Sequence, residues 1–205
     1  MEVFDAIYKR RAVKHYDSEH ELTDDEVHTL MEAAIQSPTS FNIQHWRFVL
    51  VRDKPLREQI QAAANDQAQV TDSSLLIVMT ADVKAWEKSP GRYWRDAPSE
   101  VATMLVSWMG PFYEGKNQLQ RDEAMRSCGI AGQTIMLAAK AMGYDSCPMI
   151  GFDAAAVGKL INLPGDHVIG FMIAVGKATK PAWPKPGQLP LDEVIINNRF
   201  GEPTP

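Results

Sequence analysis

Four cationic side chains lie within six residues near the start of the chain, in the stretch Lys9-Arg10-Arg11-Ala12-Val13-Lys14. The protein as a whole is acidic, with a formal net charge of −5. Arginine and lysine side chains that converge on one point bind phosphate groups, whereas a charge run on an exposed face is only solvated. The stretch alone fits both interpretations.

Two further stretches carry groups that could contact a ligand. Residues 37–46 (Ser-Pro-Thr-Ser-Phe-Asn-Ile-Gln-His-Trp) combine hydroxyls, amides and an imidazole. Such groups can form hydrogen bonds with a heteroaromatic ligand, although a polar turn anchored by Trp46 is the simpler interpretation. Farther along, Pro148 and Gly151 flank Met149 and Ile150. Glycine has no side chain, so a ligand can approach the backbone closely there.

Several common catalytic motifs are absent from the sequence. It has no Gly-rich phosphate loop, no His-Glu-x-x-His or Cys-x-x-Cys pattern and no Gly-x-Ser-x-Gly elbow. We therefore predict that side chains hold any phosphate and that an organic cofactor supplies the chemistry. No metal site is expected. Two cysteines, Cys128 and Cys147, are expected to be reduced and buried, and the scattered histidines are expected to be structural or at the surface.

Length and composition limit the class of protein. The chain has 205 residues, 45% of them hydrophobic and 23% charged, which is typical of one globular domain. Its acidic balance argues against nucleic acid or an anionic membrane as a partner. It has no apolar run of the ~20 residues that span a bilayer and no signal-peptide pattern at its start. A soluble, cytoplasmic protein is expected.

The pattern of apolar and capping residues predicts the elements that position these stretches. Helices are expected at 3–10, from the Thr23–Glu26 capping box to Pro38, and at 53–64, 122–142 and 154–161; strands are expected at 48–51, 74–79 and 168–175. Residues 82–120 are the least regular part and form either a helical excursion that covers a site or a satellite cluster. The apolar tail, 181–205, needs a surface to cover, for which a partner subunit is suitable.

The stretches together, in their order along the chain, closely resemble the FMN-dependent nitroreductase family. The resemblance rests on Lys9-Arg10-Arg11 with Lys14, on the 37–46 loop, on Pro148-x-x-Gly151-Phe152 and on the ending Gly176-Lys177 … Pro184-Lys185 … Leu189-Pro190. It spans essentially the whole chain. Within the family, the bacterial NAD(P)H nitroreductases that also reduce quinones are the most similar.

The resemblance implies an α+β fold in which helices cover both faces of a mixed central sheet, as three layers. It implies a single domain, 1–205, with 82–120 as a variable excursion and 181–205 as a tail that embraces the second subunit of an intertwined homodimer. Two FMN molecules would lie at the dimer interface. NADH or NADPH would be the reductant.

Residue roles also follow from the resemblance. Arg10 and Arg11 would contact the phosphate and ribityl groups. Lys14 would lie near the flavin pyrimidine edge and stabilise the anionic reduced flavin, which makes it the candidate catalytic residue. The 149–151 backbone would donate to flavin N5. The implied cofactor-binding residues are Arg10, Arg11, Ala12, Lys14, Pro38, Thr39, Ser40, Asn42, Gln69, Pro148, Met149, Ile150, Gly151 and Lys185, of which Thr39, Ser40 and Asn42 would come from the partner subunit.

Three positions depart from the family pattern: Ala12 replaces a frequent hydroxyl residue, Asp66 a frequent asparagine, and Gln188 a frequent arginine. These departures predict weaker FMN binding than in members with the full set. Phe41, His45, Trp94 and Phe112 are the candidates for an acceptor pocket.

The implied reaction is ping-pong: hydride passes from NAD(P)H through the flavin to a small electron-poor acceptor, such as a nitroaromatic or a quinone. Three alternatives stay open. The first is a same-fold flavoenzyme of different reaction (an enone or dihydropteridine reductase, a reductive dehalogenase, or an enzyme that fragments FMN itself). The others are a non-catalytic flavin-binding or sensor protein and a cofactor-free interaction module.

Overall fold

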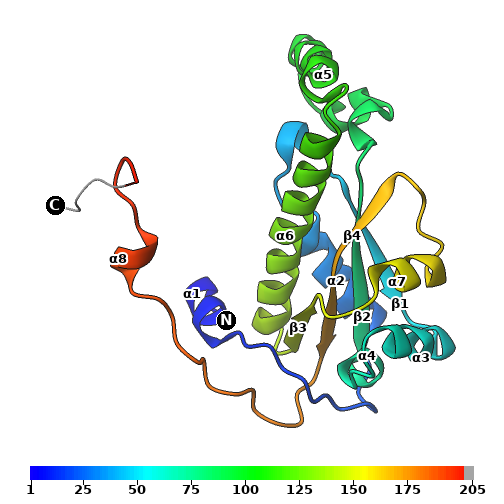
Figure 1. Cartoon of the computed structure of the whole chain (residues 1–205), viewed down its shortest axis with the longest axis vertical. Coiled ribbons are helices and arrows are strands. Elements are labelled where there is room, and N and C mark those ends of the chain that lie inside the picture. The colour runs from blue at the N-terminus through cyan, green and yellow to red at the C-terminus, as the bar shows by residue number, and fades with distance from the viewer. Residues whose placement is uncertain (201–205) are drawn as a thin grey trace.

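The computed structural model describes residues 1–200, and its centre is a four-stranded sheet in the order β1-β2-β4-β3 (Figure 1). The strands are β1 (Trp46–Val51), β2 (Leu75–Asp82), β3 (Asp145–Met149) and β4 (His167–Gly176). Each neighbouring pair is antiparallel. The helices are α1 (Val3–Lys9), α2 (Asp24–Ala34), α3 (Lys54–Ala63), α4 (Gln69–Asp72), α5 (Ser99–Tyr113), α6 (Asn117–Ala141), α7 (Ala154–Leu160) and α8 (Leu191–Val194).

Helices cover both faces of this sheet. Alternate side chains of β2 point to opposite faces, as in any strand. Ile77 and Met79 pack in one core cluster with side chains of α2 and α6, and Leu76 and Val78 pack in another with side chains of α3, α4 and α7. The expected three-layer α+β fold is thus confirmed. The expectation of a mixed sheet is wrong for residues 1–200, where all strand pairs are antiparallel and the parallel contact is an isolated bridge between Ala12 and Ser146.

Local sequence signals account for most helix ends. Thr23 and Glu26 form the predicted capping box at the start of α2, and Asp53 and Asp153 cap α3 and α7 through side-chain oxygens. Gly143 follows the end of α6 with a φ of +93°, a conformation that glycine adopts without strain. These ends position the strands and loops that follow.

The long helix α6 approaches the sheet closely. A Cβ atom on Gly132 would lie 2.2 Å from the Phe171 ring of β4, so a larger residue there would have to displace this ring. At this position, the absence of a side chain lets α6 pack closely against β4 of the same chain. Cys128 and Cys147 are both buried and unpaired, as predicted.

The predicted irregular region has its own structure. It contains two short 3-10 helices, Ala85–Glu87 and Pro90–Trp94, and then α5, which stands at one end of the molecule (Figure 1). A separate buried cluster supports it (Ile43, Ala85, Trp86, Tyr93, Met109 and Tyr113). We call residues 82–116 the excursion. Helix α6 begins at Asn117, earlier than expected.

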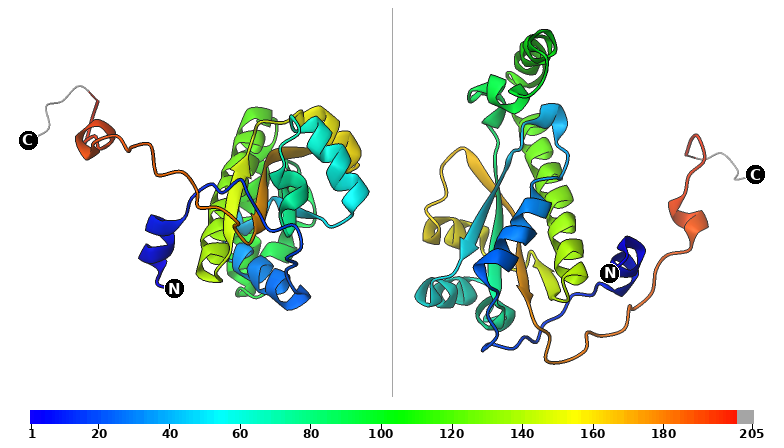
Figure 2. Two further views of the ribbon diagram at one scale, coloured as in Figure 1. Left: turned by 90° about the horizontal axis from the view of Figure 1, so that it is seen from below. Right: turned by 180° about the vertical axis from the view of Figure 1, so that it is seen from behind.

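Helix α1 contacts α6, whereas the C-terminal tail lies away from the main body (Figures 1 and 2). In α1, Phe4 and Tyr8 are each 68% exposed and only Ala6 is buried. In the tail, Trp183 is 91% exposed. Large apolar side chains are rarely left in water in such numbers, so these segments are suited to contact another surface. None of the helices within residues 1–200 is long and apolar enough to cross a membrane.

Candidate functional site

The basic stretch that follows α1 runs beside the edge strand β3. The Val13 amide donates to the Ser146 carbonyl at 3.1 Å, next to the parallel bridge between Ala12 and Ser146. Because β4 is the only strand within residues 1–200 that pairs with β3 in the sheet, the other edge of β3 can accept this segment. The chain after α1 is thereby fixed to the sheet.

A groove of about 580 Å³ lies between the basic stretch and the tail. Its lining residues are Arg10, Arg11, Ala12, Lys14, His15, Lys180, Pro181, Ala182, Trp183, Pro184, Lys185, Pro186 and Gln188. We call it the basic groove. Five of these residues are lysine or arginine and none is acidic. The groove is therefore suited to an anion with several oxygen atoms.

The basic groove brings together five of the predicted site residues: Arg10, Arg11, Ala12, Lys14 and Lys185. It also adds Lys180, which sequence reasoning missed. The departures at Ala12 and Gln188 lie in the same groove, so Lys180 supplies a cation close to the positions where the family pattern is incomplete.

The cations of the basic groove act on β3. Burial raises the pKa of the Cys147 thiol, and the charges of Lys14 and Arg10 oppose that rise. A positive charge lowers the pKa of a thiol in this way only when the two groups are close together, so Lys14 and Arg10 lie near Cys147. Arg11 is held by its own backbone, since Nη1 donates to the carbonyls of Tyr8 at 2.7 Å and of Arg10 at 2.9 Å.

The stretch Pro148–Gly151 lies at the end of β3 and is held by amide side chains. Asn65 Nδ2 and Gln67 Nε2 each donate to the Gly151 carbonyl at 3.0 Å. The predicted site residue Gln69 is only 4% exposed, and its Nε2 donates to Gln67 Oε1 at 2.9 Å. Gln69 thus reaches this stretch through Gln67. Neither Asn65 nor Gln67 was identified from the sequence.

Within this stretch the side chains differ in direction. Met149 is buried in the core cluster beneath α3 and α7, so its side chain faces away from the surface. Ile150 is 81% exposed, and Pro148 is exposed as well. A ligand at the end of β3 would therefore meet Pro148, Ile150 and the backbone.

The loop with Pro38, Thr39, Ser40 and Asn42 is remote from the basic groove of the same chain. It contacts the region before α6: Ser40 Oγ accepts from Tyr113, and Asn42 donates to the Tyr93 carbonyl. The basic groove adjoins β3, which follows α6. This helix has 25 residues and so spans ~37 Å at 1.5 Å per residue. Figure 2 shows the two regions at opposite ends of α6.

The four acceptor-pocket candidates do not form one surface. The Phe41 and Phe112 rings are 5.4 Å apart, and Phe112 is 42% exposed. His45 is only 1% exposed, its Nδ1 lies 3.2 Å from Ser127 Oγ, and burial lowers its pKa to about 4. The prediction that His45 lines such a pocket is wrong, because its ring lies beneath α5 and α6. Trp94 packs against the buried cluster of the excursion.

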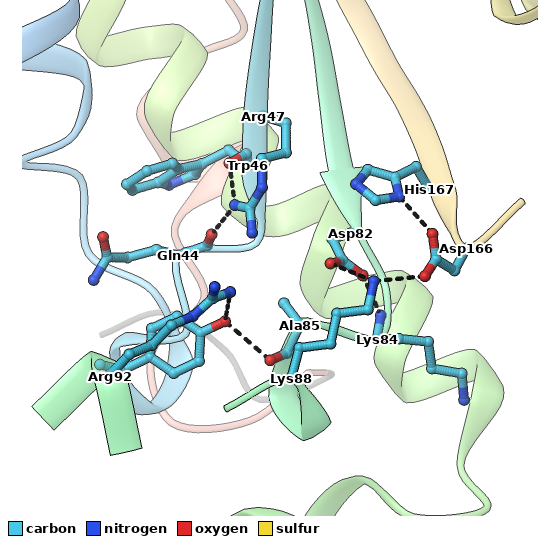
Figure 3. Close-up of polar contacts among 11 residues, drawn as sticks. Gln44, Trp46, Arg47, Asp82, Lys84, Ala85, Lys88, Arg92, Asp166 and His167 are labelled. Atoms are coloured by element: carbon cyan, nitrogen blue, oxygen red, sulfur yellow. Dashed lines mark hydrogen bonds and ion pairs between the residues drawn. The ribbon is translucent and has the colours of Figure 1, made fainter. Parts of the chain in front are cut away.

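A cluster of ion pairs fastens the excursion to the sheet (Figure 3). Lys88 Nζ lies 2.8 Å from Asp82 Oδ2 and 2.5 Å from Asp166 Oδ2, and Asp166 also contacts His167 Nδ1 at 2.7 Å. The Lys88 ammonium, followed by His167, lowers the pKa of Asp166 to about 2. Asp82, Asp166 and His167 are close enough to hold a metal ion, but the ammonium lies between the two carboxylates. This cluster connects elements and is distinct from the basic groove.

The fold and the basic groove together define a three-layer α+β protein with a groove lined by cations at the edge of its sheet. Comparison with known proteins gives the family. The chain belongs to the Nitroreductase family, whose model matches residues 7–177.

Similar proteins support this assignment over the whole length. Protein DrgA of Synechocystis sp. is 58% identical over 200 residues, which cover 95% of this chain and 95% of DrgA. An oxygen-insensitive NADPH nitroreductase of Helicobacter acinonychis is 32% identical, covering 85% of this chain and 86% of the relative. A candidate nitroreductase of Exiguobacterium sibiricum, solved in complex with FMN, superimposes with a TM-score of 0.90 at 24% identity, covering 97% and 98% of the two chains. This last similarity shows the fold.

Proposed function

We propose that the protein is an FMN-dependent oxidoreductase that passes hydride from NADH or NADPH to electron-poor acceptors such as nitroaromatics and quinones. The observation that carries the proposal is the basic groove, where five cations and no carboxylate converge in a chain of net charge −5. Family membership and the FMN complex of the Exiguobacterium neighbour support it.

The residues of the basic groove fit the chemical groups of FMN. Arg10, Lys180 and Lys185 are the cations that we assign to the phosphate dianion, because an ester phosphate needs several donors. Arg11 contributes a further positive charge near the end of α1. With Lys180 included, charge compensation no longer depends on residues 12 and 188. We still expect weaker FMN binding than in members that have the full set of phosphate contacts, because Ala12 has no hydroxyl to donate to the phosphate.

Lys14 is the cation that we assign to the redox end of the cofactor. The bound flavin would supply hydride transfer, so the protein has only to orient it and adjust its electrostatics. A fixed ammonium stabilises negative charge that develops nearby during the reaction. Within residues 1–200 Lys14 forms no ion pair, so its charge is available for this purpose.

The backbone at Ile150 and Gly151 is the second group that we assign to the redox end. Two amide side chains, Asn65 and Gln67, hold the Gly151 carbonyl from the same side. Because a peptide unit is planar, the Phe152 N–H is fixed with this carbonyl, and it donates to the Ile150 carbonyl at 3.0 Å, which in turn holds the peptide unit of the Gly151 N–H. The neighbouring N–H groups can then keep one direction towards a ligand.

We further propose that the site is completed by a second copy of the chain. The loop with Thr39, Ser40 and Asn42 cannot reach the basic groove of its own chain, and the apolar side chains of α1 and the tail are exposed. In a homodimer in which the tail of one subunit embraces the other, the loop of one subunit could reach the basic groove of its partner. The apolar side chains of α1 and the tail would be covered. As an enzyme of the NAD(P)H pool with two free, buried cysteines, it belongs in the reducing cytoplasm.

Anaerobic reduction tests the proposal. Purified protein reconstituted with FMN is mixed with NADH and, separately, with NADPH, and the flavin absorbance is followed. Bleaching, then reoxidation by a panel of nitroaromatics, quinones, enones and halogenated aromatics, is the expected result, and the panel identifies the acceptor class. A yellow protein that neither nucleotide bleaches would be a flavin-binding protein without this activity. A protein that gains no flavin spectrum with added FMN would contradict the proposal.

A further inference from the structure

The loop that carries Ser40 and Asn42 has an unfavourable backbone conformation. Phe41, Asn42 and Gln44 have φ values of 51°, 55° and 53°, in the left-handed region. For residues other than glycine this region is higher in energy, because the Cβ atom clashes with the backbone, and the increase is smallest for asparagine. Three such residues within four positions persist only where surrounding contacts hold them.

Tyr113, the last residue of α5, provides one of these contacts. It is fully buried, and its hydroxyl donates to Ser40 Oγ at 2.8 Å. Its ring lies edge-on to Phe41, with 6.1 Å between the ring centroids, and 6.4 Å from His45. The Tyr113 ring thus lies next to the first left-handed residue, Phe41, and to His45, which follows the last.

Two other contacts hold the same loop. Asn42 Nδ2 donates to the Tyr93 carbonyl at 2.8 Å. Arg47 Nη1 donates to the Gln44 carbonyl at 2.8 Å from the start of β1 (Figure 3). Two of the three contacts, from Tyr113 and Tyr93, come from the excursion.

We propose that Tyr113 is a positioning residue for the cofactor site: through Ser40 it holds the 38–44 loop in the conformation that the partner subunit's flavin requires. This inference rests on the proposed function, since it assumes FMN and a second subunit. It assigns to the excursion a role beyond acceptor recognition. The buried cluster beneath α5 supports the cofactor loop of one site.

The geometry also connects the acceptor to the cofactor. Phe112 precedes Tyr113 and is 42% exposed, and its ring is tilted by 59° to the Phe41 ring, with 5.4 Å between the ring centroids. An acceptor that contacts Phe112 therefore contacts the residue next to the support of the loop. Changes in the excursion that alter acceptor choice are expected to alter FMN affinity as well.

Two matched variants test this inference. Tyr113→Phe keeps the ring and removes only the hydroxyl that contacts Ser40. Tyr93→Phe is the control, because the Tyr93 hydroxyl donates to the Ala85 carbonyl at 2.9 Å in the same cluster, while its backbone contact with Asn42 remains. Each variant loses a buried hydroxyl, so comparable decreases in Tm are expected.

Two measurements distinguish the variants. In the apoprotein, Tyr113→Phe should accelerate amide hydrogen exchange at residues 39–45, whereas Tyr93→Phe should not. In FMN titrations, Tyr113→Phe should raise the Kd roughly five- to tenfold, the size of one hydrogen bond, and Tyr93→Phe less than about twofold.

Other results would overturn the inference. Equal exchange at 39–45 in the two variants would show that the hydroxyl does not hold the loop. Faster exchange with an unchanged FMN Kd would show that the loop is held but that the cofactor does not depend on it. If the wild type binds FMN while the variants give either of these results, only the role of Tyr113 is contradicted and the proposed function stands. If the wild type binds no FMN, both the role of Tyr113 and the proposed function are contradicted.

Discussion

Lys9 and Lys14 belong to the same basic stretch but have different surroundings. Lys9 pairs with Asp5 at 3.2 Å on the exposed side of α1, with both side chains more than half exposed. Lys14 lines the basic groove beside β3. An exposed pair of this kind contributes little to stability or binding, whereas an unpaired cation in a groove is available to a bound anion.

Lys14→Ala is therefore expected to slow flavin reduction by NAD(P)H about tenfold or more, while nicotinamide binding weakens much less. The reason is that the ammonium stabilises charge that forms only during hydride transfer. Single-turnover anaerobic kinetics separate the rate from the binding constant. Lys9→Ala is the control and should change neither. Unchanged reduction kinetics in Lys14→Ala would remove this residue from the mechanism.

His45 makes the stability depend on pH. Its pKa is lowered to about 4 by burial, from the ordinary value of 6.5. Below pH 6.5 the unfolded chain therefore binds a proton at this position and the folded chain does not, until the pH approaches 4. The free energy of unfolding should fall by ~2 kcal/mol between pH 7 and pH 5 through this group.

Urea unfolding at several pH values measures this effect. In His45→Gln the decrease between pH 7 and pH 5 should be smaller by that amount. His28→Gln is the control, because the His28 side chain is 73% exposed on α2. Identical pH profiles for wild type and His45→Gln would contradict the account of a buried neutral imidazole.

At the scale of elements, the ion pairs around Lys88 hold the excursion against β2 and β4. Asp82 is the buried partner, with a side chain 4% exposed, whereas the Asp166 side chain is 37% exposed. The buried carboxylate depends on the ammonium, because a charge left alone in the interior is costly. The more exposed Asp166 pair adds less, since solvent screens it.

Lys88→Met should therefore destabilise the protein by about 1–2 kcal/mol and loosen residues 83–98. Limited proteolysis should cleave within this segment faster than in wild type. Lys84→Met is the control, because Lys84 Nζ donates to the neutral Gln120 at 3.0 Å. Equal cleavage rates in wild type and Lys88→Met would show that the cluster does not hold the excursion.

Most elements could be predicted because their signals are local. The capping box at Thr23 and the cap at Asp153 each involve residues at most three positions apart. Strand β3 could not be predicted, because Asp145, Ser146 and Pro148 interrupt any strand pattern. Proline is tolerated there only because β3 is an edge strand, and that is a property of the assembled sheet.

The residues of the candidate site could likewise be predicted where their contacts are local in sequence, and were missed where the contacts join distant segments. Arg10 and Lys14 are neighbours in sequence, so their convergence is local. Lys180 was missed because it is about 170 positions away from them and meets them only after β4 returns the chain to this edge. Gln67 was missed because its contact with Gly151 joins the segment before α4 to the segment after β3, 84 positions apart in the sequence. Family resemblance supplied Lys185, which no local pattern indicates.

At the scale of the whole molecule, the exposed apolar side chains of α1 and the tail predict a dimer. Sedimentation of the wild type should give about twice the 22.8 kDa chain mass. Phe4→Glu should shift this to the monomer and release FMN, since it places a charge in the interface. Lys159→Glu, on α7, is the control and should stay dimeric. A wild-type monomer with FMN bound would contradict the shared site.

The central claim is that the basic groove holds the phosphate of FMN, and riboflavin, which lacks that phosphate, tests it most directly. Wild-type apoprotein should bind FMN at least about 100-fold more tightly than riboflavin at low ionic strength, and added salt should narrow the difference. Lys180→Ala should weaken FMN binding about five- to tenfold and leave riboflavin binding unchanged. Equal affinities of the wild type for the two flavins, or equal losses for both in Lys180→Ala, would contradict the claim.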